Sequence, residues 1–190
     1  MGGGVKALFD LAGKPLLQHV IDRLAPQVGQ LMLSVEIATG EFETFGLVQV
    51  PDPEPGSKGP LGGLAAALRH LEDSDEQWLL LVPCDAPFLP PDLARKLLQK
   101  AKSERTKVAV ASYGSELQPT FSLWHRDLRD VLERAVNEDR MAGFKQFLHG
   151  RPFSVVDWAV SPLNPFFNIN DPSALEDARK MMSKQTGTKA

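Results

Sequence analysis

Apolar residues follow two kinds of spacing along this chain, one helical and one in short continuous runs. Residues 15–24 carry apolar side chains at helical spacing, and Pro15 suits the first turn of the helix that they predict. The run LMLSV at 31–35 predicts a short buried strand. The run WLLLV at 78–82 has no polar alternation, which is typical of a strand covered on both faces.

The rest of the chain continues the alternation between helices and strands. Further helices are expected at 61–71, from Pro91 to about Lys102, at 126–136, at 141–149 and from Pro172 to about Lys184, and further strands at 108–111, 121–124 and 154–158. Such alternation implies right-handed crossovers and a mostly parallel sheet in an α/β fold. We expect one domain over 1–184 and a frayed polar tail over 185–190.

Doubly wound sheets bind their ligands beyond the carboxyl ends of the strands. Three segments occupy such places in this chain, at 51–63, 83–91 and 167–171. The candidate chemistry of the protein is therefore expected in these segments.

Composition and charge narrow the classes of protein that remain. The chain has 190 residues, 43% of them hydrophobic and 24% charged, which is typical of a globular domain. The net charge of −3 comes without a basic stripe, so a nucleic-acid partner is not expected. The single cysteine, Cys84, excludes an intrachain disulfide, and it has no evident histidine partner for nucleophilic chemistry. Without an apolar run of about 18 residues or a signal peptide, we expect a cytoplasmic protein with no membrane contact.

The first candidate feature is the glycine-rich segment MGGGVK at the start of the sequence. The N–H groups of Gly2 and Gly3 could cradle an anion, to which Lys6 would add a full positive charge. A flexible tail with a solvated lysine is the alternative, and short glycine-rich segments discriminate poorly between the two.

The second feature is Asp52 with the segment GPLGG at 59–63. A carboxylate at a strand end can accept hydrogen bonds from a base or a ribose. The backbone of Gly59, Pro60, Leu61 and Gly62 would face a nucleotide at the start of a helix. An Asx turn at Asp52 and tight helix–sheet packing at the glycines remain equally good interpretations.

The third feature is Asp85, where an apolar strand ends in one carboxylate between two prolines. Pro83 and Pro87 stiffen the turn and hold the side chain at the sheet edge. Mg²⁺ takes oxygen ligands, commonly one or two carboxylates together with substrate phosphates. The pattern favours a Mg²⁺ ligand at Asp85 over a simple turn or N-cap aspartate.

The fourth feature is the segment FNINDP before the last helix. Asn168 and Asn170 would point to one face of an extended strand and could bind the polar edge of a ligand such as a pterin. Turn-forming asparagines are the alternative, and Asp171 is expected to cap the helix that follows. Arg140 could clamp a phosphate in a bidentate contact or form a surface ion pair.

Taken in order, these motifs resemble molybdenum cofactor guanylyltransferases. The matching segments are MGGGVK at 1–6, GKPLL at 13–17, Asp52, GPLGG at 59–63, PCDAPFLPP at 83–91, QPT at 118–120 and NINDP at 168–172. The match covers nearly the whole chain, and the pair GPLGG and PCDAPF is its most specific part.

The resemblance implies a fold and a reaction. The fold is the nucleotide-diphospho-sugar transferase type, a Rossmann-like three-layer αβα sandwich with a mostly parallel mixed sheet, here with the family's first strand missing. The reaction is transfer of GMP from GTP to the molybdopterin form of the molybdenum cofactor, which gives the guanine dinucleotide cofactor and pyrophosphate. Transient contacts with other cofactor-biosynthesis or acceptor proteins are a further expectation.

The resemblance also implies a role for individual residues. Lys6 and Asp85 would be catalytic, and Asp85 would bind Mg²⁺. The nucleotide would be bound by Gly2, Gly3, Lys6, Asp52, Gly59, Pro60, Leu61, Gly62 and Asp85. The pterin would be bound by Arg140, Asn168 and Asn170.

The sequence departs from the family pattern at its beginning. The family's LAGG turn and the basic residue before MGG have no counterpart, Val5 stands where an aspartate is usual, and Ser34 stands where a base-contacting asparagine is frequent. We therefore expect Met1 to be an internal methionine, or the chain to be a shortened form. The alternatives are a cytidylyltransferase acting on molybdopterin or another small phosphate, and a non-catalytic relative.

Overall fold

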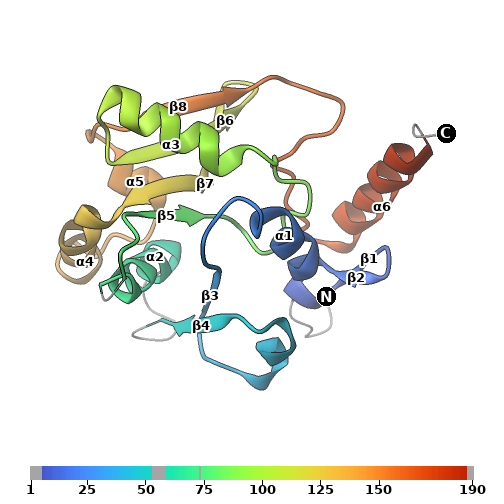
Figure 1. The fold of residues 1–190 in the computed structure, drawn as a ribbon, viewed down its shortest axis with the longest axis horizontal. Helices are drawn as coiled ribbons and strands as arrows, with labels where there is room; N and C mark the ends of the chain where they lie inside the picture. The colour runs from blue at the N-terminus through green and yellow to red at the C-terminus, as the bar shows by residue number, and fades with distance from the viewer. Residues whose placement is uncertain (1–5, 53–58, 73, 188–190) are drawn as a thin grey trace.

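The computed structural model describes residues 6–52, 59–72 and 74–187, which fold into an α/β structure (Figure 1). Its largest sheet has the strand order β5-β7-β6-β8, formed by Trp78–Leu81, Glu116–His125, Val108–Tyr113 and Ser154–Trp158. A separate parallel pair is formed by β3 (Met32–Val35) and β4 (Val48–Pro51). A short antiparallel ribbon, β1 (Asp10–Leu11) with β2 (Lys14–Pro15), precedes the first helix.

The described helices follow the expected periodicity closely. They are α1 (Leu16–Leu24), α2 (Gly59–His70), α3 (Leu93–Glu104), α4 (Arg129–Asn137), α5 (Phe144–Leu148) and α6 (Pro172–Gly187), with short 3₁₀ turns η1 (Lys6–Leu8), η2 (Gly40–Phe45) and η3 (Arg126–Leu128). The last helix includes residues 185–187, which the sequence assigned to a polar tail, and residues 188–190 lie outside the described residues. None of the described helices has the length and apolarity needed to cross a membrane.

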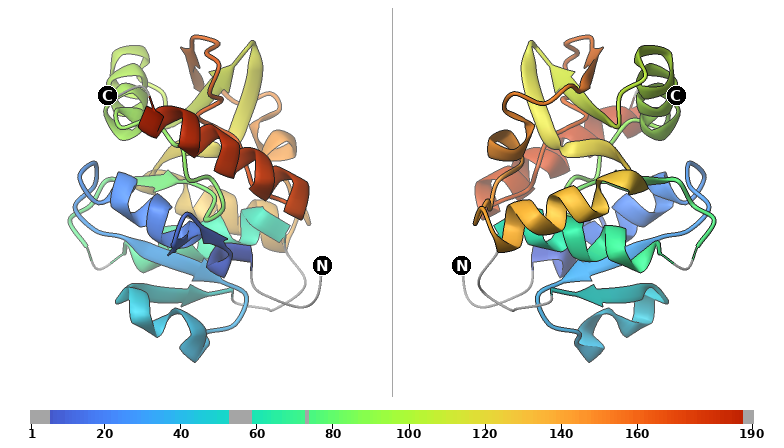
Figure 2. Two further views of the ribbon diagram at one scale, coloured as in Figure 1. Left: turned by 90° about the vertical axis from the view of Figure 1, so that its right-hand side faces the viewer. Right: turned by 90° about the vertical axis from the view of Figure 1, so that its left-hand side faces the viewer.

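Helices cover both faces of the main sheet, which confirms the three-layer architecture. On one face, α2, α4 and α5 pack on Val108, Val110 and Trp124. On the other face, α1 and α3 pack on Ala109 and Ala111, the residues that alternate with those valines along β6. Figure 2 shows β3, β4 and η2 together at one end of the molecule.

The main sheet is mixed because β7 runs antiparallel to both of its neighbours. A two-residue turn joins β6 to β7, and its residues Gly114 and Ser115 both have positive φ angles, 58° and 67°. Turns of this kind match the twist of paired antiparallel strands, so they produce a hairpin instead of a crossover. The sequence predicted a mostly parallel mixed sheet, and this local turn makes β6 and β7 one of its antiparallel pairs.

The described residues before α1 form the 3₁₀ turn η1 and the β1–β2 ribbon. The turn of the ribbon is Ala12-Gly13, whose φ angles of 54° and 84° are both positive. No backbone pairing joins β3 to β5 in the described structure, so its parallel and mixed sheets remain separate.

The packing of α3 predicts a large effect of one core substitution. Leu97 is completely buried between α3 and the sheet, so Leu97→Ala should lower the free energy of unfolding by about 2–5 kcal/mol. Urea denaturation would measure the change. Val160→Ala is the control, because Val160 is 71% exposed and its truncation should change stability by no more than about 0.5 kcal/mol. Equal effects of the two substitutions would contradict the packing described for α3.

Candidate functional site

Two segments distant in the sequence meet just beyond the carboxyl end of β5. The backbone N–H of Ile169 donates a hydrogen bond of 3.0 Å to the carbonyl of Asp85, which ties the FNIND segment to the strand-end loop. The ammonium group of Lys6 lies 3.4 Å from Oδ1 of Asn170, 164 positions away in the sequence. Lys6, Asp85 and Asn170 therefore gather at one place, as the strand-end rule predicts.

Burial sets the charge state of Asp85. The side chain is partly buried, and burial raises its pKa above the ordinary aspartate value, while a backbone hydrogen bond and the nearby Lys6 charge act in the opposite direction. An ionised Asp85 is therefore incompletely compensated by its protein neighbours. A cation bound beside it would stabilise the ionised form.

The neighbouring thiol is not a nucleophile near neutral pH. Burial, followed by the charge of Asp85, raises the pKa of Cys84 to about 11. The thiolate is the reactive form of cysteine, and it is scarce under these conditions. Cys84 packs against the apolar cluster that contains Leu33 and Val35.

A second group of polar side chains lies at the start of α2. Asp52 continues the β3–β4 pair, since its N–H donates to the carbonyl of Val35 at 2.9 Å. A Cβ atom at Gly63 would lie 2.8 Å from Oγ of Ser34 and 3.3 Å from Oδ1 of Asp52. The missing side chain of Gly63 thus allows a hydroxyl and a carboxylate to approach the helix closely. Burial, followed by the charge of Glu36, raises the pKa of Asp52.

Gly63 is a site residue that the sequence analysis did not single out. It is the last residue of GPLGG, and its signal was only the second of two adjacent glycines. Its importance depends on the positions of Ser34 and Asp52, which lie on other elements. Ser34 had been noted only as a departure from the family pattern, and its exposed hydroxyl proves to be part of this group.

The four predicted nucleotide-binding residues at 59–62 do not have equal roles. Gly59 and Pro60 are exposed at the start of α2. Gly59 has a φ of 55°, and a Cβ atom there would lie 3.0 Å from the carbonyl oxygen of Ala142. Leu61 has no exposed surface, and its N–H is already bonded to the carbonyl of Ala142 at 3.2 Å. The side chain of Leu61 therefore belongs to the core, and Gly62 is also buried.

The predicted pterin residues lie in two different places. Arg140 is exposed, with a φ of 52°, in the loop whose Ala142 contacts the start of α2. Asn168 and Asn170 belong to the segment tied to Asp85, and that segment has no strand conformation. The segment forms no strand ladder, and the shared face expected for the two asparagines stays a prediction. Asn170 is exposed, whereas Oδ1 of Asn168 is buried and has no hydrogen-bond partner in the described structure.

A buried acceptor without a donor is uncommon in folded proteins and calls for an explanation. Asn168 directly precedes Ile169 in the sequence, and the backbone N–H of Ile169 ties the segment to the carbonyl of Asp85. Asp171 has the role that the sequence predicted, since its Oδ1 accepts a 2.8 Å hydrogen bond from the Ala174 N–H at the start of α6. The segment thus combines a helix cap with a buried acceptor that has no partner among the described residues.

The described structure offers few side chains that could ligate a metal ion at this place. Within the described ranges, no group of three or more histidine, cysteine or acidic side chains could hold a metal ion. Asp85 is a single carboxylate, so a divalent cation there would take its other oxygen ligands from a phosphate substrate or water. That arrangement suits Mg²⁺, which commonly keeps one or two carboxylates together with substrate phosphates. The predicted nucleotide contacts at Gly2 and Gly3 lie outside the described residues.

Comparison with known proteins gives a consistent picture. The chain is 38% identical over 183 residues to a molybdenum cofactor guanylyltransferase of Rhodopseudomonas palustris, covering 95% of this chain and 87% of that protein. It is 35% identical to one of Nitrobacter hamburgensis, covering 98% and 90%. The crystal structure of molybdopterin-guanine dinucleotide biosynthesis protein A from Archaeoglobus fulgidus superposes with a TM-score of 0.73 at 23% identity, covering 96% and 92%.

The structural likeness establishes the shared fold, and the two sequence relatives also match almost the whole chain. The family model for the MobA-like NTP transferase domain matches residues 1–155, which include β3 to β7, the group of Ser34, Asp52 and Gly63, and also Lys6 and Asp85, whereas Asn170 lies beyond the matched range. With most of its length matched, the chain belongs to the MobA-like NTP transferase family.

Proposed function

We propose that the protein transfers GMP from GTP to the molybdopterin form of the molybdenum cofactor. The observation that carries the proposal is the meeting of Lys6, Asp85 and Asn170 beyond β5, in a chain 38% identical to a molybdenum cofactor guanylyltransferase. A cation, a carboxylate and polar acceptors in one place suit a polyphosphate substrate and its metal. The products would be the guanine dinucleotide cofactor and pyrophosphate.

The reaction is a displacement at the α-phosphorus of GTP. A phosphate oxygen of the pterin substrate forms the new P–O bond, and the bond from the α-phosphorus to the bridging oxygen breaks. The electron pair leaves with pyrophosphate. Because the attacking phosphate oxygen is already ionised, no strong general base is required. Catalysis then depends on positioning the two substrates and on neutralising their charge.

Each charged residue beyond β5 has a distinct part in this proposal. Lys6 is exposed and would neutralise negative charge on the leaving pyrophosphate. Asp85 would hold Mg²⁺, together with oxygen atoms of the substrate phosphates. When bound, the ion supplies charge neutralisation at the phosphate oxygens. Asn170, in contact with Lys6, keeps the ammonium group at the site.

Other polar residues would bind the nucleoside of GTP and the pterin substrate. Asp52 and Ser34, brought together beside Gly63, offer acceptors for the donors of a guanine base or ribose. Asn168 offers a buried, unpartnered oxygen to the N–H groups of a pterin. Arg140, on the loop next to α2, would contact a phosphate of the pterin substrate. A cytoplasmic location and transient contacts with acceptor proteins remain predictions.

The direct test is a transfer assay with molybdopterin, Mg²⁺ and GTP labelled in the α-phosphate. Label should enter the dinucleotide product, unlabelled GTP should compete, and an equal concentration of CTP should compete at least tenfold less well. Preferential use of CTP would identify a cytidylyltransferase. The absence both of transfer and of a heat of GTP binding by calorimetry would contradict the proposal and favour a non-catalytic relative.

Replacing the Asp85 carboxylate should lower transfer activity without lowering the stability of the fold. Asp85→Asn keeps the size of the side chain but loses the charge, so transfer should fall by about 10²–10³-fold. Burial raises the pKa of Asp85, so ionisation at this site disfavours the folded state as pH rises above the unfolded-state pKa. The variant should therefore be at least as stable as the parent near neutral pH in thermal unfolding. Asp75→Asn, on an exposed loop, is the control, and full activity of Asp85→Asn would disprove the metal-ligand role.

The charge on Lys6 should control the titration of Asp85. Lys6→Met removes a positive charge that lowers the pKa of Asp85, so the raised pKa should rise further. The carboxyl carbon shift of Asp85 followed by NMR during a pH titration measures this without reference to activity. Lys14→Met is the matched control, because Lys14 pairs with Asp22 at 2.9 Å. If the titration of Asp85 is unchanged in Lys6→Met, the charge of Lys6 does not act on Asp85 and the prediction is wrong.

The close approach at Gly63 predicts a defect that a second substitution relieves. In Gly63→Ala the new methyl group would meet the Ser34 hydroxyl at 2.8 Å and displace it or Asp52. The KM for GTP should rise about tenfold, equivalent to about 1.4 kcal/mol of binding. The double variant Gly63→Ala, Ser34→Ala should recover part of the loss relative to Gly63→Ala, with Ser34→Ala alone as the reference. An unchanged KM in Gly63→Ala would remove this group from the nucleotide site.

A further inference from the structure

Strand β7 contains an irregularity to which the proposed function gives no role. Val110 of β6 pairs with Ser122 of β7, and the next residue of β6, Ala111, pairs with Gln118. Residues 119–121 therefore have no partner on β6, and we call them the β7 bulge. Bulges are frequent next to active sites, where they redirect a side chain. The side chains of the β7 bulge are therefore candidates for contact with a substrate.

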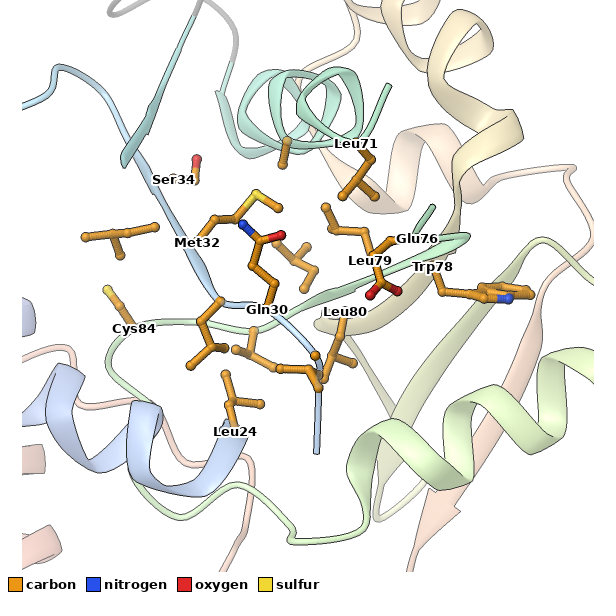
Figure 3. Close-up of a pocket in the computed structure, with 17 residues that line it drawn as sticks. Leu24, Gln30, Met32, Ser34, Leu71, Glu76, Trp78, Leu79, Leu80 and Cys84 are labelled. Carbon is orange, nitrogen blue, oxygen red and sulfur yellow. The ribbon is translucent and has the colours of Figure 1, made fainter. Parts of the chain in front are cut away.

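The β7 bulge lies at the carboxyl end of β5. The two strands are antiparallel, and their last pair at this end is Leu81 with Ser122. Beyond this pair β5 continues toward Asp85, while β7, followed toward its amino end, continues into residues 119–121. Figure 3 shows the chain leaving β5 and reaching Cys84, the residue before Asp85. The bulge therefore lies beside the loop that carries the proposed metal ligand.

Buried hydrogen bonds hold the β7 bulge in one conformation. Ser122 has no exposed surface, and its hydroxyl donates a 2.6 Å hydrogen bond to the carbonyl of Pro119. The same hydroxyl accepts a 2.7 Å hydrogen bond from Nε1 of Trp124, which is also completely buried. A buried polar network whose members are all paired makes the backbone around it rigid. The bulge is therefore a fixed element of the sheet.

An aromatic contact joins the β7 bulge to the segment that carries Asn168. The rings of Phe121 and Phe166 meet edge to face, with 4.8 Å between their centroids. Phe166 also packs edge to face on Trp158, at 5.3 Å, and it is almost completely buried. Asn168, two residues after Phe166, has the buried oxygen without a partner among the described residues. The bulge and this segment therefore border the same part of the site.

Thr120 is the polar side chain of the β7 bulge. It lies between Pro119, which the Ser122 hydroxyl holds, and Phe121, which packs in the core. The side chain is partly buried, and its hydroxyl has no hydrogen-bond partner within the described ranges. A threonine hydroxyl can donate one hydrogen bond and accept two. Because an unpaired polar group is costly once water is excluded, a ligand that covers Thr120 should pair with its hydroxyl.

The surroundings of Thr120 indicate which substrate its hydroxyl meets. Figure 1 shows β5 between β7 on one side and the β3–β4 pair on the other. The β7 bulge and the group of Ser34, Asp52 and Gly63 therefore flank β5 from opposite sides. The bulge lies instead beside the segment with Asn168, on the side assigned to the pterin substrate. The phosphate of that substrate needs donors, because its oxygens only accept hydrogen bonds.

We propose that Thr120 is a substrate-binding residue whose hydroxyl donates a hydrogen bond to the phosphate of the pterin substrate. The inference rests on the proposed function and adds a residue to its acceptor side. The contact would orient the attacking phosphate oxygen toward the α-phosphorus of GTP, which is the positioning that the displacement requires. The hydroxyl keeps its proton throughout, since the attacking oxygen is already ionised.

The substitution Thr120→Val tests the hydroxyl, because valine keeps the β-branched shape and loses only the polar group. In calorimetry with molybdopterin, without GTP, the Kd should rise about tenfold relative to the parent chain. In the transfer assay the KM for molybdopterin should rise by a similar factor, while the KM for GTP should change by less than about twofold. Thr120→Ser keeps the hydroxyl and should bind molybdopterin nearly as well as the parent.

Two controls separate the loss of a contact from a disturbed fold. Thr39→Val removes an exposed threonine hydroxyl that makes no cap hydrogen bond, in the loop bonded to Gln49 of β4, and it should change neither KM. The melting temperature of Thr120→Val should stay within about 2 °C of the parent value, because the lost hydroxyl has no partner in the described structure. A structural role for the hydroxyl would lower the melting temperature further.

A matched ligand identifies the group that the hydroxyl contacts. Molybdopterin from which the phosphate has been removed should bind equally well to the parent and to Thr120→Val. If Thr120→Val weakens binding of both ligands to the same extent, the hydroxyl contacts the pterin ring and the assignment to the phosphate is wrong.

Other results would overturn the proposal as a whole. These are equal binding of molybdopterin by the parent and Thr120→Val, an equal loss in Thr120→Ser, or an increase only in the KM for GTP. Binding of molybdopterin that depends on the hydroxyl, in a chain that transfers no GMP, would reject the proposed function and leave this contact standing. If the parent chain binds no molybdopterin, both proposals are wrong.

Discussion

The backbone hydrogen bond from Ile169 to Asp85 is the contact on which the arrangement of the site depends. It holds the segment before α6 against the loop after β5, and Ile169 is almost completely buried beside it. Asn168 and Asn170 flank this bond, so it carries one amide oxygen into a buried position and the other toward Lys6. Three parts of the chain that are far apart in sequence thereby share one strand end. A loop that supplied Asp85 alone would offer a substrate one carboxylate and little else.

Electrostatics give this strand end its chemical character. Burial raises the pKa values of Asp85 and Asp52, and Lys6 offsets part of the effect at Asp85. A protein pays for such uncompensated carboxylates in stability, and perturbed acids of this kind cluster at functional sites. Under the proposed function, substrate phosphates and Mg²⁺ would complete the charge balance at Asp85, and base or ribose donors would do so at Asp52. Burial and the neighbouring charge of Asp85 also raise the pKa of the Cys84 thiol, so this thiol stays protonated and unreactive near neutral pH.

The separation of the two sheets links the fold to the site. Asp52 follows the β3–β4 pair, whereas Asp85 follows β5 of the main sheet, so the two acids are carried by different sheets. Helices α1 and α2 hold those sheets together through the apolar clusters at their interface.

The sequence by itself determined the features that depend on near neighbours in the chain. Apolar periodicity predicted the helices and most strands, Asp171 was identified as a helix cap, and Asp52 and Asp85 were identified as strand-end acids. Tertiary structure alone decided the pairing of β7 with β5, the contact between Lys6 and Asn170, the importance of Gly63 and the burial of Leu61. The reason is physical: periodicity and capping act over a few residues, whereas a side chain's neighbours and its pKa depend on how distant segments pack.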